Sequence, residues 1–76
     1  MRILSQDKTA SVDESGVLLL VSENYVVAAF PIEEVGLIRL GEYKNKERAM
    51  EVLADIHTLY EELPFSGSTV FYMPKE

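Results

Sequence analysis

The residue type best suited to acid–base chemistry, histidine, occurs once in this 76-residue chain, as His57. A histidine that acts as a catalytic base needs a nucleophile and an orienting carboxylate within hydrogen-bond reach. Asp55 is only two residues away, and side chains two positions apart on a helix do not face each other. We therefore interpret His57 as a partly exposed surface residue and predict that the chain is not an enzyme.

Three pairs of adjacent carboxylates offer a second kind of chemistry, either proton transfer or binding of a divalent cation. They are Asp13–Glu14, Glu33–Glu34 and Glu61–Glu62. None has the Asp-x-Asp-x-Asp-Gly spacing of a calcium-binding loop. The chain contains no cysteine and a single histidine, which excludes thiolate sites and histidine clusters. We therefore predict solvated acids, no metal site and no cofactor.

Arg39 is the strongest candidate for a binding residue, because it interrupts the apolar run 37–40. A guanidinium group is well suited to hold a carboxylate or a phosphate, and Tyr25 and Tyr43 are tyrosines that could stack beside a ligand. We predict Arg39, Tyr43 and Tyr25 as ligand-binding residues, with Arg2 as a weaker candidate of the same kind. The alternative interpretation makes Arg39 an edge residue that discourages aggregation and the tyrosines part of the packing.

A β-hairpin is the element that the sequence predicts most strongly. The apolar runs 17–22 and 25–30 are separated only by Glu23 and Asn24. Two residues is the commonest hairpin loop, and asparagine tolerates the positive φ that such a turn needs. The resulting register places Ser22 opposite Tyr25, Val21 opposite Val26 and Leu19 opposite Ala28.

Further strands are expected at 3–6, 9–12, 35–43 and 69–73, where Gly36 or Gly41 would permit a bulge or a close backbone approach. From residue 45 onward the apolar period changes to about 3.6, which is typical of an amphipathic helix. Its predicted apolar stripe consists of Ala49, Leu53, Ile56, Tyr60 and Leu63, widened by Val52 and Leu59. Asn45 is the predicted N-cap and Pro64 the predicted stop.

These elements predict one α+β domain over residues 1–76. We expect an antiparallel sheet of about four to six strands packed on one amphipathic helix at about 45–62, with the last strand at the C-terminal end.

The hairpin carries more apolar surface than one helix can cover. Both of its faces are apolar, whereas a sheet with one face in water normally alternates apolar and polar residues. Either the sheet curls over its second face or another copy of the chain covers it. We predict a homo-oligomer, with a dimer favoured, that associates through Leu18, Leu20 and Val27.

The composition narrows the class of partner and the compartment. Thirteen acidic and seven basic residues give a net charge of −6, and the basic residues form no cluster, so we expect no nucleic-acid partner. The amino-terminal residues lack the apolar run of a signal peptide, and no stretch approaches the length of a membrane span. Together with the absence of cysteine, this predicts a cytoplasmic protein without a membrane partner.

Three short segments carry a resemblance: Met-Arg-Ile-Leu-Ser-Gln-Asp at 1–7, Gly-Glu-Tyr-Lys-Asn-Lys-Glu-Arg-Ala at 41–49 and Val-Phe-Tyr-Met-Pro at 70–74. In this order they resemble a family of short uncharacterised proteins from Firmicute bacteria and their prophages. Members of that family begin with an Ile-Ser-Gln-Asp-like strand and end in a Phe-x-Phe-Pro-like strand. The chain departs from the family at its helix cap, where Lys44 or Asn45 stands in place of serine. It also lacks the long insert that many members carry before the last strand.

Two hypotheses about function follow. The leading one is a non-enzymatic, self-associating accessory protein that binds a partner protein or a small ligand. The alternative is motivated by Arg39 and the tyrosines: sequestration of a small phosphorylated ligand, a cyclic nucleotide, between subunits. The layout loosely resembles phage anti-defence proteins, which implies the same function by analogy only. An acidic decoy for a DNA-binding protein is disfavoured, because basic residues are interspersed among the acids.

Overall fold

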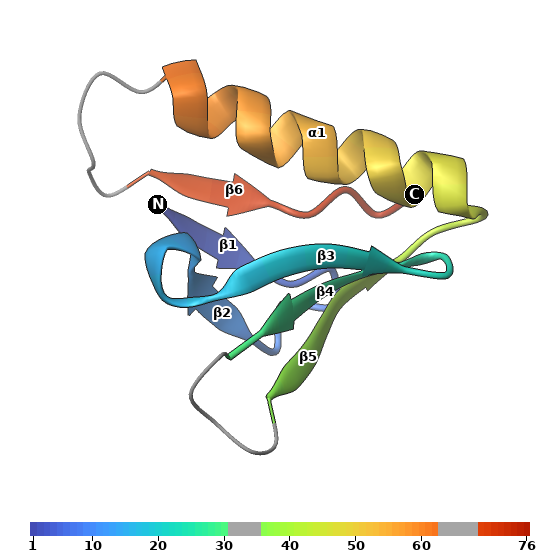
Figure 1. Cartoon of the computed structure of the whole chain (residues 1–76), viewed down its shortest axis with the longest axis horizontal. Helices are drawn as coiled ribbons and strands as arrows, with labels where there is room; N and C mark the ends of the chain where they lie inside the picture. The colour runs from blue at the N-terminus through green and yellow to red at the C-terminus, as the bar shows by residue number, and fades with distance from the viewer. Residues whose placement is uncertain (31–35, 63–68) are drawn as a thin grey trace.

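The computed structural model describes residues 1–30, 36–62 and 69–76 (Figure 1). The predictions for Pro64, Leu63 and the Glu33–Glu34 pair fall outside these residues. In chain order the elements are β1 (Arg2–Leu4), β2 (Ser11–Asp13), the short 3-10 helix η1 (Glu14–Gly16), β3 (Leu18–Ser22), β4 (Tyr25–Ala29), β5 (Leu37–Glu42), α1 (Lys46–Glu62) and β6 (Val70–Tyr72).

The fold is α+β with one α-helix in its described part, as predicted, but its strands form two sheets and not one. One sheet has the order β2-β1-β6 and the other the order β3-β4-β5. The expected antiparallel arrangement is also incomplete, because β1 and β6 pair in parallel. Parallel strands need a long crossover connection, and here β2 to β5 and α1 all lie between the two. Neither of these short strands has a local sequence pattern that predicts the parallel pairing.

The predicted hairpin is confirmed with its register. Ser22 pairs with Tyr25, Val21 with Val26 and Leu19 with Ala28. The prediction that Asn24 adopts the positive φ of the turn is wrong, however, because Glu23 has the positive φ, at 55°. Asn24 instead accepts a bond from the Tyr43 N–H through its main-chain oxygen and donates its side-chain amide to the Tyr43 carbonyl, at 2.9 and 2.8 Å.

The predicted N-cap of α1 is also confirmed, since the Asn45 carboxamide oxygen accepts from the Arg48 N–H at 2.8 Å. The buried stripe of the helix differs from the prediction. It is centred on Ala49, Val52 and Ile56, whereas Tyr60 is 53% exposed. The predicted stripe and the observed stripe both fit a period of 3.6 residues. The contacts of α1 with β3 and β4 determine which of the two is buried.

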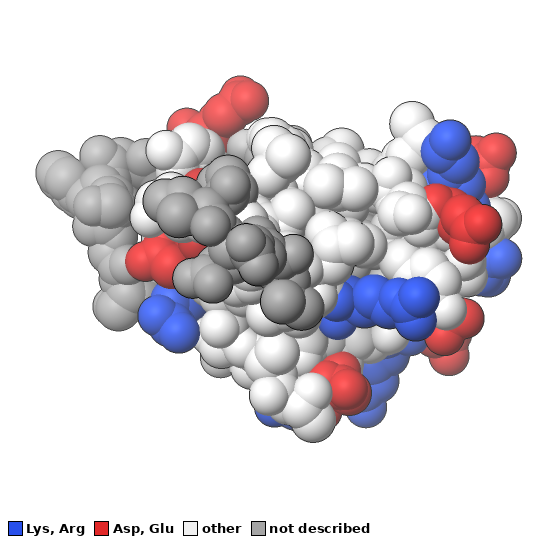
Figure 2. Space-filling view, turned by 60° about the horizontal axis from the view of Figure 1, so that its bottom comes forward, with Lys and Arg blue, Asp and Glu red and all other residues white. Residues whose placement is uncertain are grey.

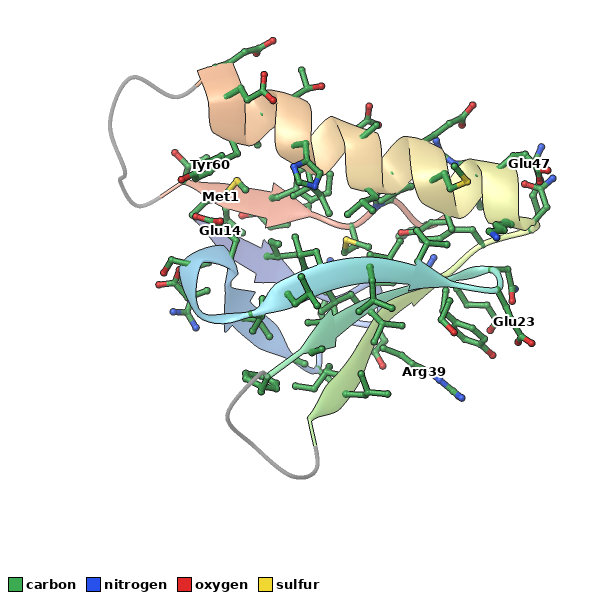
Figure 3. The ribbon with its side chains drawn as sticks, in the orientation of Figure 1. Met1, Glu14, Glu23, Arg39, Glu47 and Tyr60 are labelled. Carbon is green, nitrogen blue, oxygen red and sulfur yellow. The ribbon has the colours of Figure 1, made fainter. Side chains whose placement is uncertain are left out.

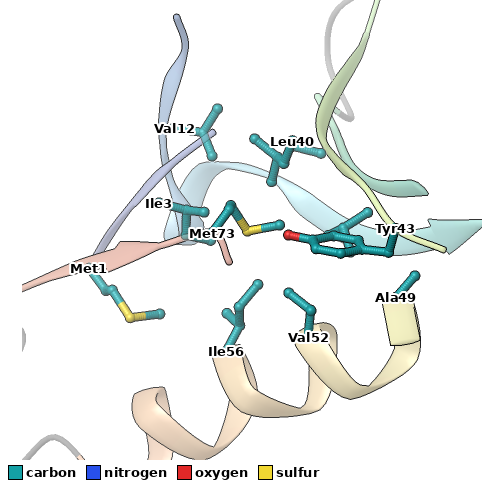
Figure 4. Packing of buried hydrophobic residues seen from close by; sticks show 11 residues of the cluster. Met1, Ile3, Val12, Leu40, Tyr43, Ala49, Val52, Ile56 and Met73 are labelled. Carbon is teal, nitrogen blue, oxygen red and sulfur yellow. The ribbon is translucent and has the colours of Figure 1, made fainter. Parts of the chain in front are cut away.

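The core lies between α1 and the two sheets (Figure 4). Its most completely buried large side chains come from every layer: Ile3, Val26, Leu40, Val52 and Ile56. The core therefore joins the β1 sheet, the β4 sheet and the helix into one unit.

The β3-β4-β5 sheet turns its other face away from this core, and we call that side the outer face. The predicted association residues Leu18, Leu20 and Val27 all lie on it by register. Leu18 is 61% exposed and Leu20 half-buried, but Val27 is only 4% exposed because it lies on the central strand between Leu20 and Arg39.

Candidate functional site

Arg39 and Tyr25, two of the three predicted ligand-binding residues, come together on the outer face. The Arg39 guanidinium carbon lies 4.5 Å from the centroid of the Tyr25 ring, in cation–π geometry. The adjacent strands β5 and β4 carry the two residues, and Figure 3 shows Arg39 pointing away from α1. The ring therefore orients the guanidinium at the surface, where no residue of the described ranges accepts a hydrogen bond from it.

A small groove of about 190 Å³ contains this pair. Besides Arg39 and Tyr25 it is lined by Gln6, Asp7, Leu40, Gly41 and Glu42. Hydrogen bonds from the Thr9 hydroxyl, the Thr9 N–H and the Ser5 hydroxyl lower the pKa of Asp7 to about 2, so its carboxylate is charged at neutral pH. One guanidinium beside two carboxylates gives the groove a net negative charge, which disfavours an anionic ligand, and most of all one with several charges.

Tyr43, the third predicted ligand-binding residue, lies on the other side of β5, away from Arg39. It is 3% exposed, and its hydroxyl donates to the Pro74 carbonyl at 2.9 Å. Burial raises the pKa of the Tyr43 phenol, and the nearby Arg48 guanidinium partly offsets that rise. The structure thus places Tyr43 in the core and gives it a structural contact.

A β-bulge explains why Tyr43 and Arg39 lie on opposite sides of β5. The pairing of β4 with β5 shifts between Val26 and Val27, so that Val26 pairs with Gly41 and Val27 with Arg39. Leu40 is the extra residue, and it points inward, as Gly41 also does. Strict alternation from Arg39 would bring Tyr43 to the outer face, but one inserted residue reverses the alternation.

Gln6 joins three segments and was not recognised from the sequence. Its N–H donates to the Leu40 carbonyl at 2.7 Å, and its carboxamide oxygen accepts from the Glu42 N–H at 2.9 Å. Its side-chain nitrogen, which has two hydrogens to share, lies within hydrogen-bond distance of the main-chain oxygens of Glu42, Pro74 and Lys75, at 3.1, 3.1 and 2.8 Å. We call this set of contacts the Gln6 junction; it links β1 to the end of β5 and to the segment after β6.

The turn after β1 holds Gln6 in place. Ser5 is buried, and its hydroxyl donates to the Asp7 carboxylate at 2.8 Å while it accepts from the Ala10 N–H at 3.0 Å. The Asp7 carboxylate also accepts from the Thr9 N–H and hydroxyl, and Lys8 has a positive φ of 65°. The Ser-Gln-Asp sequence therefore builds a tight polar turn.

Three segments singled out in the sequence, 1–7, 41–49 and 70–74, meet at this junction. Gln6 binds Glu42 and Pro74, and Tyr43 binds Pro74. The one sequence signal that could have indicated Gln6 was its place in the first of these segments. Their shared contacts give the short motifs a role in folding.

A larger open cleft of about 970 Å³ lies beside the start of α1. Its charges are mixed: Glu42, Glu47, Glu51 and Glu76 line it together with Lys44, Arg48 and Lys75. Arg48 is already engaged, since its guanidinium donates to the main-chain oxygen of Glu76 at 2.7 and 3.0 Å and contacts the Glu51 carboxylate at 3.2 Å. The cleft offers a ligand no concentrated charge of either sign.

The remaining sequence candidates are separate from these sites. His57 is exposed on α1, and the Arg2 guanidinium donates to the Ser11 hydroxyl at 3.1 Å. In the described ranges 1–30, 36–62 and 69–76, no three potential metal-ligating side chains gather into a site. Among the same residues, no helix is both long enough and apolar enough to cross a membrane.

Comparison with protein-family models, with curated proteins and with solved structures found no match to the chain.

Proposed function

We propose that this chain is a non-enzymatic, self-associating accessory protein whose outer face is its contact surface. One observation carries the proposal: Leu18 and Leu37 are 61% and 69% exposed on the same face of one sheet. Monomers rarely leave a continuous apolar patch in water, and such patches mark interaction sites. In Figure 2, where the lower side of Figure 1 comes forward, charged side chains lie mostly at the border of a broad uncharged area.

Sedimentation velocity tests this proposal. The sedimenting mass is expected to rise from 8.6 kDa towards twice that value as the concentration increases from low to high micromolar. A single 8.6-kDa species over the whole range would refute self-association.

The Arg39–Tyr25 pair favours a second candidate function, the binding of a small phosphorylated ligand such as a cyclic nucleotide. The 4.5 Å cation–π contact pre-orients the guanidinium, which reduces the entropy lost when an anion binds. Asp7 and Glu42 weaken this candidate, because they would repel a multiply charged phosphate. A thermal-shift panel of mono- and dinucleotides tests it. Stabilisation by one nucleotide that Arg39→Ala abolishes would support ligand binding, and no shift with any nucleotide would contradict it.

A further inference from the structure

One cross-strand row of the outer face is symmetric about the central strand β4. It consists of Leu18, Ala29 and Leu37, so a small residue on β4 lies between two exposed leucines. The next row consists of Leu20, Val27 and Arg39. A face with this pattern can meet a copy of itself with leucine opposite leucine.

We propose that the outer face packs on the outer face of a second copy, with a two-fold axis parallel to β4. This deepens the proposed function and rests on it. In this arrangement β3 of one copy lies over β5 of the other, so Leu18 contacts Leu37 of the second copy, and the reciprocal contact forms by symmetry. The two sheets form a sandwich about 10 Å thick, with an apolar layer between them.

The charges of the chain agree with a second copy as the occupant. The outer face carries Arg39 and Glu42, and the register places them opposite Leu20 and Ser22 of the second copy. Within the described strands, the register opposes neither of these two charges to a like charge, and the aliphatic stem of Arg39 can cover Leu20. Exposed acids lie instead along α1, on the opposite side of the sheet: Glu47, Glu51, Asp55, Glu61 and Glu62. Two chains of charge −6 can thus associate with these acids far apart.

The size of the face sets the strength of the contact. Three strands about 4.8 Å apart and about five residues long, at about 3.3 Å each, cover roughly 14 by 17 Å. The area of this face is well below the roughly 800 Å² that each partner buries in a standard stable interface. The arrangement therefore predicts a weak dimer that dissociates on dilution.

Charge substitution tests which surface is used. Leu37→Lys and Leu18→Lys alter exposed side chains and should leave the fold intact, as circular dichroism would show. Each is expected to weaken dimerisation at least tenfold in sedimentation velocity. Met50→Lys is the matched control, because Met50 is 54% exposed on α1, away from the outer face. Unchanged association in Leu37→Lys would overturn the proposed arrangement while self-association itself stood.

Cysteine cross-linking tests the orientation, and the chain has no cysteine to interfere. Leu18→Cys and a size-tagged Leu37→Cys variant are oxidised separately and then as a mixture. The arrangement predicts a disulfide-linked heterodimer in the mixture and little cross-linking in either variant alone. In a double variant, the two cysteines of one chain would be two strands apart, at about 10 Å, and too far for an internal disulfide.

Other cross-linking patterns would refute the arrangement. Efficient self-cross-linking of Leu18→Cys, or a Leu18→Cys pair with Ser22→Cys, would indicate that β3 strands pair edge to edge. A chain that is monomeric at every concentration, without any cross-link, would overturn both the arrangement and the proposed function.

Discussion

The Gln6 side chain forms a reciprocal pair of hydrogen bonds with the main chain of Glu42, accepting from its N–H at 2.9 Å and donating to its carbonyl at 3.1 Å. At the end of β5, the side chain thereby forms the main-chain hydrogen bonds that a neighbouring strand would otherwise form. Because the same nitrogen is also within hydrogen-bond distance of the Pro74 and Lys75 oxygens, Gln6 contacts residues that are 36, 68 and 69 positions away in the sequence. The two sheets are linked at this point as well as through the core.

Gln6→Ala should lower the free energy of unfolding by about 2 kcal/mol, since the main-chain groups around the junction lose partners inside the fold. Gln6→Glu should cost at least as much at neutral pH, because a carboxylate would face three carbonyl oxygens and could not donate to them. Urea unfolding measures both variants. A loss below about 0.5 kcal/mol in each would show that water satisfies the junction equally well.

Local patterns predicted the elements that depend on neighbours in sequence. The hairpin register followed from the two-residue loop between Ser22 and Tyr25, and the helix cap from Asn45. Both are decided within a few residues, so the sequence contains the information directly.

What was missed depends on contacts between distant segments. The parallel pairing of β1 with β6 joins Ile3 to Phe71, and neither three-residue strand has a pattern that specifies its partner. The expectation that Gly41 could permit a bulge is met by the register shift of β4 against β5, but the prediction of Tyr43 as a ligand-binding residue beside Arg39 did not take that bulge into account. A single inserted residue reverses every later side chain, and glycine marks only that such an insertion is tolerated.

Glu23→Gly should stabilise the protein by about 0.5–1 kcal/mol, because a residue other than glycine at a φ of 55° is strained. Glu23 and Asn24 form the two-residue loop of the hairpin, and Asn24 is held by two hydrogen bonds with Tyr43. Thermal unfolding measures the effect. Lys44→Gly is the control: Lys44 has no positive φ, so the same change there should not stabilise.

The Asp7 turn makes part of the stability depend on pH. Hydrogen bonds from Thr9 and Ser5 lower the folded-state pKa of Asp7 from its ordinary value of 3.8 to about 2. A depressed pKa in the folded state adds stability above the unfolded pKa, and that stability is lost as the pH falls from about 4 to about 2. Asp7→Asn should flatten the acid limb of the stability profile in this window. Direct titration of Asp7 by NMR to an ordinary value would contradict the hydrogen-bonded turn.

Gly41 and Tyr43 should be energetically coupled, because a Cβ on Gly41 would lie 2.8 Å from the Tyr43 hydroxyl oxygen and 2.9 Å from a ring carbon. The ring cannot move away easily, since it is buried and its hydroxyl is bound to Pro74. Gly41→Ala should therefore cost about 1–3 kcal/mol. Tyr43→Leu alone leaves a cavity and loses the bond to Pro74, so it should also destabilise.

In the double variant the leucine no longer meets the new methyl group, and the methyl partly fills the cavity. The loss should then be smaller than the sum of the two single losses by about 1 kcal/mol or more, as measured by urea unfolding in a double-mutant cycle. Gly16→Ala is the matched control, because a Cβ there meets nothing within 4 Å, and its effect should add to that of Tyr43→Leu. Additivity at Gly41 as well would mean that β5 shifts freely around the bulge. The bulge would then not be what fixes Tyr43 in the core and separates it from Arg39.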